Sequence, residues 1–131
     1  MILAIRSDQA QAELYLLDAG AKQLAKKVWQ ADRELAKTLL HHIELLCEQA
    51  NGKLSEITGI IVFSGEGSFT GLRIGATVAN ALAYSYQVPV ATGKGSGWIA
   101  QGLEQLKTAK VGDYVVPKYD RAPNITKPKS A

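Results

Sequence analysis

The sequence has one cysteine, two histidines and no long apolar run, and each shortage excludes a class of protein. A single cysteine cannot form a disulfide within the chain, which is compatible with a reducing cytosol. No run approaches the roughly 20 apolar residues that a membrane-spanning helix needs. Arg6 and Asp8 interrupt the apolar start before a secretory signal could form. We therefore expect a cytoplasmic protein without membrane association.

The few metal-binding and nucleophilic side chains are poorly placed for catalysis. His41 and His42 are adjacent, so on a helix they point about 100° apart and cannot hold one metal ion together. Cys47 lies in a segment with helical periodicity, where a lone cysteine is expected to be a small core residue. The sequence therefore indicates no metal, no cofactor and no protease site.

Charge is unevenly distributed along the 131 residues. Residues 1–109 hold ten Lys/Arg and ten Asp/Glu, so the formal net charge of +3 falls entirely in residues 110–131. We predict one compact domain over 1–109 and a basic, proline-containing tail over 110–131. Such a tail either contacts nucleic acid or an acidic protein surface, or is a solvated extension that keeps the protein soluble.

Apolar periodicity and turn residues predict an α/β fold. The expected elements, by residue range, are strands 2–7, 11–18 and 23–30, a helix 35–49, a strand 59–63, a helix 71–86, a strand 88–91 and a helix 98–106. Asp32 is the expected N-cap of the first helix and Asn51-Gly52 its stop signal. The first three strands should form an antiparallel meander, because tight turns join only antiparallel neighbours. The β-β-β-α-β-α-β-α order predicts a mixed five-stranded sheet, the topology of actin-like and RNase H-like lobes.

The glycine-rich segment from Gly65 to Gly71 joins a buried strand directly to a helix. Backbone N–H groups at such a junction can bind an anion. A Walker loop needs Lys and then Ser/Thr after its last glycine, whereas Leu72 and Arg73 follow here, and the Rossmann spacing is one residue too long. The favoured interpretation is a tight turn capped by Ser68 or Thr70. Nucleotide binding by this loop stays open as the alternative.

Small residues recur every four positions along the second helix, at Gly71, Gly75, Ala79 and Ala83. Glycine within a helix costs about 1 kcal/mol relative to alanine, which close packing can offset. This stripe either packs on the helix at 35–49 of the same chain or lets a helix of another polypeptide approach closely. We expect the second arrangement, a bundle of helices from two proteins.

The run from Gly67 to Gly75, Gly-Ser-Phe-Thr-Gly-Leu-Arg-Ile-Gly, resembles the signature of the bacterial TsaB family, also called YeaZ. Three further segments are similar to the corresponding parts of that family, namely the apolar start Met1 to Ile5, Val88-Pro89-Val90 and the ending from Val116 to Arg121. The resemblance implies a non-catalytic subunit, and not an enzyme itself, that pairs through helices 35–49 and 71–86 with a TsaD-like catalytic subunit. Together with a TsaE-like ATPase, that complex transfers a threonylcarbamoyl group to an adenosine of tRNA.

On this resemblance the chain contacts tRNA only through the complex, and it can form a homodimer when alone. The expected partner interface comprises Leu39, Ile43, Ser68, Phe69, Thr70, Gly71, Leu72, Arg73, Gly75, Ala79 and Ala83. The expected tail contacts are Lys118, Tyr119 and Arg121. No residue is expected to be catalytic. A small ATPase built on the Gly65–Gly71 loop and a direct RNA-binding module are the alternatives.

Three departures from the family pattern bear on function. Arg6-Ser7 stands where the family usually has Asp-Thr, and arginine does not coordinate the cation of a metal-bound phosphate. Glu66 replaces a proline between two glycines and adds a negative charge. Lys110 to Asp113 joins the third helix to the tail almost directly, so we expect the second lobe of full-length members to be missing here, and without it an actin-type cleft cannot be completed.

Overall fold

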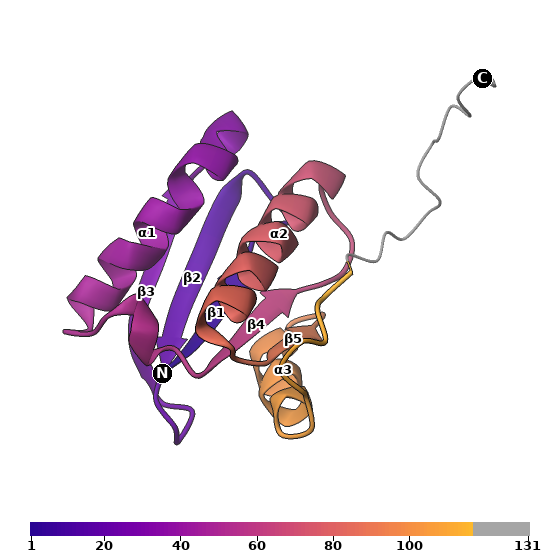
Figure 1. Ribbon diagram of the computed structural model, residues 1–131. Coiled ribbons are helices and arrows are strands. Elements are labelled where there is room, and N and C mark those ends of the chain that lie inside the picture. Colours follow the sequence, from indigo (N-terminus) through magenta and orange to yellow (C-terminus); the bar gives the residue numbers. More distant parts are fainter. Residues whose placement is uncertain (117–131) are drawn as a thin grey trace.

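The computed structural model describes residues 1–116, apart from the side chain of Phe69. The described elements are β1 (Ile2–Arg6), β2 (Gln11–Leu17), β3 (Gln23–Gln30), a 3₁₀ turn η1 (Asp32–Glu34), α1 (Leu35–Gln49), a 3₁₀ turn η2 (Leu54–Glu56), β4 (Gly59–Phe63), α2 (Phe69–Tyr86), β5 (Val90–Gly93) and α3 (Trp98–Leu106). This order confirms the predicted succession of strands and helices (Figure 1). None of these helices is long and apolar enough to cross a membrane.

The five strands form one mixed sheet in the order β3-β2-β1-β4-β5. β1, β2 and β3 are consecutive antiparallel neighbours, with Ile5 opposite Leu14. β4 pairs parallel to β1, and β5 pairs parallel to β4. The sheet confirms both the predicted meander and the predicted β-α-β units, whose helices return the chain to start each parallel strand.

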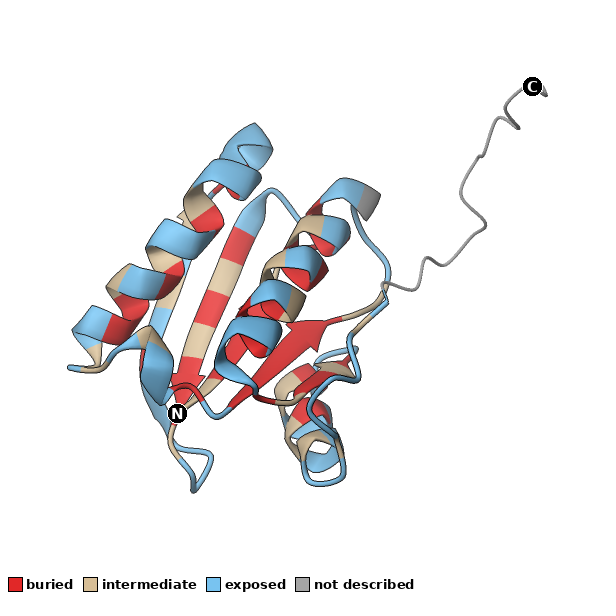
Figure 2. Ribbon diagram, in the orientation of Figure 1, coloured by how far each residue is buried: buried red, intermediate tan, exposed pale blue. Residues whose placement is uncertain are grey.

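Helices cover both faces of the sheet. α1 and α2 lie side by side over one face (Figure 1), where Leu3, Ile5 and Ile60 belong to the main core. α3 packs against β4 and β5 on the opposite face, where Ile61 and Trp98 belong to a second cluster. Every residue of β4 is buried (Figure 2), as expected for a central strand covered on both sides.

The start of α1 differs from the prediction. Asp32 is not the N-cap, because it opens η1 with φ of +47° and its carboxylate accepts a hydrogen bond from Gln30 Nε2 at 2.9 Å. The N-cap position is Glu34, which makes no side-chain capping bond. The backbone N–H groups of Ala31 and Asp32 both donate to the Ala10 carbonyl, so the β1–β2 turn fixes how the chain enters the helix.

The other boundaries follow local chemistry. α1 ends as predicted, since Asn51 takes φ of +57° and Gly52 N–H donates to the Cys47 carbonyl at 2.8 Å. The last strand begins at Val90, two residues later than predicted. Val88 N–H still donates to the Ala83 carbonyl at the end of α2, and Pro89 has no N–H for a ladder.

Candidate functional site

The glycine-rich loop between β4 and α2 packs closely against the backbone that follows β1. Gly67 has φ of +151°, and a Cβ there would lie 2.6 Å from Asp8 Cβ. A Cβ on Gly71 would overlap the Ser7 carbonyl oxygen. Ser68 N–H donates to the Asp8 carbonyl at 3.0 Å, and Ser7 Oγ donates to the Gly71 carbonyl at 2.7 Å. The glycines are therefore needed for packing against the β1–β2 turn.

The first turn of α2 is capped by the chain itself. Ser68 has extended backbone geometry, and its Oγ accepts a hydrogen bond from Gly71 N–H at 3.2 Å. This confirms the predicted capping by Ser68 and uses one of the N–H groups that an anion would need. The favoured interpretation of the loop as a tight turn is therefore supported by its hydrogen bonds.

The stripe of small residues on α2 packs on the chain's own sheet, which corrects the prediction that it faces another polypeptide. A Cβ on Gly75 would overlap Ser7 Oγ and lie 3.7 Å from Ile5 Cγ2, both on or next to β1. Ala79 and Ala83 belong to the main core. The buried positions of the predicted partner interface are Leu39, Ile43, Gly71, Leu72, Gly75, Ala79 and Ala83. These seven positions therefore stabilise the fold and do not present a surface.

Among the predicted interface residues whose side chains the structure describes, which leaves out Phe69, the exposed ones are Ser68, Thr70 and Arg73. The predicted tail contacts Lys118, Tyr119 and Arg121 lie outside the described residues. Val115, from the described part of the predicted tail, lies against α2, because the Asn80 side chain makes two 2.9 Å hydrogen bonds with its backbone N–H and carbonyl.

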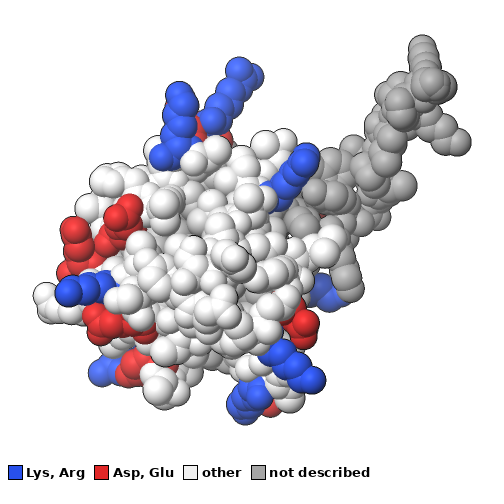
Figure 3. Space-filling model, in the orientation of Figure 1, with Lys and Arg blue, Asp and Glu red and all other residues white. Residues whose placement is uncertain are grey.

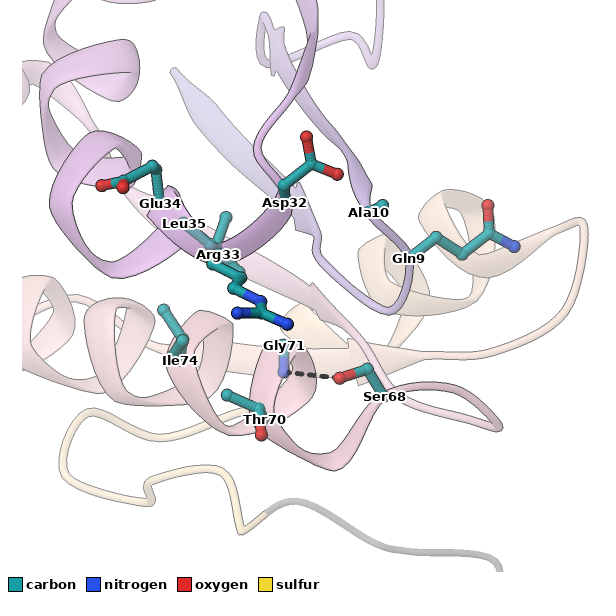
Figure 4. Close-up of a pocket in the computed structure, with 10 residues that line it drawn as sticks. All are labelled: Gln9, Ala10, Asp32, Arg33, Glu34, Leu35, Ser68, Thr70, Gly71 and Ile74. Atoms are coloured by element: carbon teal, nitrogen blue, oxygen red, sulfur yellow. Dashed lines mark hydrogen bonds between the residues drawn. The ribbon is translucent and has the colours of Figure 1, made fainter.

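A groove of about 830 Å³ opens where the starts of α1 and α2 meet the β1–β2 turn (Figure 4). Leu35 and Ile74 supply apolar lining, and Ser68 and Thr70 line its other side. The Arg33 guanidinium points toward the first turn of α2. The groove brings Ser68 and Thr70 of the predicted interface together with the start of the first helix.

At the other end of the same helices, Glu44 and Cys47 of α1 share a smaller cavity of about 280 Å³ with Tyr86 of α2. Leu40 lies one helical turn before Glu44, so it lies on the side of α1 that faces α2. The two helices therefore run parallel, with a continuous outer surface between the two cavities.

We call this outer surface the α1/α2 face and define it by Leu40, Ile74, Val78, Ala81 and Tyr84. Ile74 and Val78 are half-buried against the main core, Ala81 is exposed, and Leu40 and Tyr84 are 45% and 67% exposed. Figure 3 views the molecule from this side, and most charged side chains lie around the margin of the face. The interface predicted from the sequence contained none of these five residues, although the helical period of the two segments indicates which residues share a side.

Charged and aromatic groups interact on the α3 side of the sheet. Arg6 Nε donates to Asp8 Oδ1 at 2.9 Å, where the Asp8 side chain is only 4% exposed. This hydrogen bond raises the pKa of Arg6, and the guanidinium carbon lies 4.0 Å from the centre of the Phe63 ring. The Tyr15 hydroxyl donates to Glu13 at 2.5 Å, and burial followed by this hydrogen bond raises the pKa of Tyr15 to about 12. Arg6 and Asp8 therefore form an ion pair, and Tyr15 and Glu13 form a hydrogen bond, within the chain.

The thiol of Cys47 is also placed for packing. Cys47 is buried, and burial raises the pKa of its thiol, which keeps it in the weakly nucleophilic protonated form at neutral pH. Within residues 1–116, no group of three His, Cys, Asp or Glu side chains could hold a metal ion. Trp98 is buried, and its ring packs edge-on against Tyr15 and Phe63.

Comparison with known proteins gives consistent matches. A family model described as TsaD, tRNA N6-adenosine threonylcarbamoyltransferase, matches residues 29–92. The tRNA threonylcarbamoyladenosine biosynthesis protein TsaB of Haemophilus influenzae is 28% identical over 109 residues, which are 83% of this chain and 45% of that protein. The structure of YeaZ from Pseudomonas aeruginosa superposes with a TM-score of 0.65 at 30% identity, over 71% of this chain and 43% of that one.

A structure with much lower sequence identity shares the fold. RuvC of T. thermophilus, solved with a Holliday junction substrate, has a TM-score of 0.51 at 10% identity over 71% of this chain and 63% of that one. At this identity the likeness shows the fold alone. The chain spans less than half the length of the TsaB and YeaZ relatives. Over the part that they cover, these comparisons support assignment of the chain to the TsaB/YeaZ family.

Proposed function

We propose that this chain acts in tRNA threonylcarbamoyladenosine biosynthesis as a non-catalytic subunit that docks on a TsaD-type catalytic subunit through the α1/α2 face. The pathway is supported by the name of the TsaB relative and by the TsaD description of the matching family model. The docking surface is a proposal that differs from the sequence prediction, because it uses the outward residues of the helices.

The observation that carries this proposal is the composition of the α1/α2 face. Leu40 and Tyr84 are exposed on helices whose charged neighbours lie at the margin (Figure 3). An exposed apolar patch with a polar rim is typical of a protein–protein interface. Tyrosine is enriched among the residues that dominate binding energy, and Ala81 beside it leaves room for a partner helix.

The absence of catalysis by this chain is proposed from its local chemistry. The loop at Gly67 and Gly71 uses its backbone for contacts with Asp8 and Ser7, and Arg6 is paired with Asp8. Acyl transfer is therefore assigned to the partner, and we propose no cofactor or metal for this chain. The same proposal has three further parts. A TsaE-like ATPase is a further partner, contact with tRNA is indirect, and the chain forms a homodimer in the absence of TsaD.

Co-elution with the TsaD-type subunit of the same organism on a sizing column tests the docking surface. Leu40→Glu introduces a charge into the α1/α2 face and should abolish co-elution. Val28→Glu is the matched control, because Val28 is a similarly exposed apolar residue on the opposite side of the sheet, and should leave co-elution intact. Loss of the complex in both variants, or in neither, contradicts the proposed face.

A second candidate function is nucleotide binding in the groove at the helix starts. Its support is the volume of about 830 Å³ together with the Arg33 guanidinium directed at the start of α2. Titration calorimetry with ATP and Mg²⁺ separates the two functions. Binding that Arg33→Ala removes would favour the second candidate, whereas no heat of binding is expected for a docking subunit.

A further inference from the structure

The contact between α1 and the edge strand β3 is made by a histidine stacked on a tryptophan. The ring centres of His42 and Trp29 are 4.1 Å apart, with 34° between the ring planes. Trp29 also donates from Nε1 to Thr38 Oγ1 at 3.3 Å, one turn earlier on α1. The neighbouring His41 is exposed. The two histidines of the sequence therefore sit in very different surroundings, and one serves as an internal control for the other.

His42 is placed so that its charged form is unfavourable. Its Nδ1 atom is buried and has no hydrogen-bond partner within residues 1–116. Burial lowers the pKa of His42, and Lys27 of β3 and His41 of α1 lower it further. Those are the charged or titratable groups that act on the ring from the two elements it joins.

We propose that the His42–Trp29 contact is a proton-sensitive latch that holds α1 on β3 when the imidazole is neutral and weakens when it is protonated. A proton at Nδ1 would create a buried N–H without an acceptor, and buried donors without partners are costly. It would also place a positive charge near Lys27. The latch is inferred from these contacts alone and does not depend on the proposed function.

The sign of the pH effect follows from proton linkage. A histidine whose pKa is lowered by folding binds more protons in the unfolded chain, so stability increases with pH. The stabilisation is complete above the ordinary histidine pKa of about 6.5 and is lost as the pH falls below it. If His42 stayed neutral throughout, the unfolding equilibrium constant would rise by at most about tenfold between pH 7.5 and 5.5.

Nuclear magnetic resonance of the full chain tests the latch directly. The imidazole resonances of the two histidines are assigned with His41→Gln and followed from pH 8 to pH 5. The midpoint of His42 should lie below the ordinary histidine pKa of about 6.5. The indole N–H resonance of Trp29 should move with the His42 midpoint, and that of Trp98, on the other face of the sheet, should not. In His42→Phe, which keeps an aromatic stack, the Trp29 resonance should no longer respond to pH.

Urea unfolding at pH 7.5 and 5.5 supplies the second readout. The pH-dependent change in the unfolding constant should persist in His41→Gln and disappear in His42→Phe. An ordinary or raised His42 pKa would show that attraction of the imidazolium to the indole outweighs burial, and would overturn the proposal. A Trp29 resonance that ignores His42 would overturn it too. Both of these readings come from the unsubstituted chain, so they stand even if a variant fails to fold.

Discussion

At the scale of single residues, the glycines of the signature run are explained by contacts that no local pattern reveals. Gly67 and Gly71 are recognisable in the sequence as turn and helix-start residues. Their close neighbours, Asp8 and Ser7, come from about 60 residues earlier in the chain, on the β1–β2 turn. The capping role of Ser68 could be predicted because it is local, whereas the failure of Asp32 as a cap results from distant bonds to Ala10.

Gly71→Ala is expected to destabilise the fold strongly, because its methyl group would overlap the Ser7 carbonyl oxygen, which belongs to the backbone and cannot turn away. Overpacking of this kind typically costs about 1–3 kcal/mol. Urea unfolding measures the loss. Gly20→Ala is the control, since the nearest atom to a Cβ there is Asp18 Oδ1 at 3.5 Å. Equal stability of the two variants would contradict the packing role of Gly71.

At the scale of the elements, the sequence predicted the order and type of every strand and helix, because apolar periods are local. It did not predict which side of α2 meets the sheet. Small residues every four positions allow close approach of any backbone, and here the approaching backbone is β1. The larger exposed side chains, above all Tyr84, lie on the other side. The side that meets the sheet can be identified only when the position of β1 relative to α2 is known.

In the segment after α3, Val115 accepts and donates one hydrogen bond each with the Asn80 side chain of α2 and also packs against the main core. Asn80→Ala should lower stability by about 1–3 kcal/mol, since each of its two hydrogen bonds contributes roughly 0.5–1.5 kcal/mol. Amide hydrogen exchange at Val115 should accelerate at the same time. Thr77→Ala, an exposed position one turn earlier, should change neither quantity. Unaltered exchange at Val115 in Asn80→Ala would show that other contacts hold the segment.

At the scale of the whole molecule, the described part of the chain is one mixed sheet with helices on both faces, and the chain spans less than half of its TsaB and YeaZ relatives. Arg6 and Asp8, beside the glycine loop, are paired with each other, and on the side seen in Figure 3 most charged side chains lie around the margin of the α1/α2 face. These properties favour a role in which this chain supplies a binding surface and a partner supplies the chemistry.

Site-specific photocrosslinking to the TsaD-type subunit tests this account most directly. A photoreactive phenylalanine replaces Ala81, which is exposed on the α1/α2 face, or Ala100, which is exposed on α3 at the opposite side of the sheet. We predict a crosslinked product of one copy of each chain from position 81 and little from position 100. Crosslinking from position 100 alone, or none from position 81 while the two proteins still form a complex, would contradict the account.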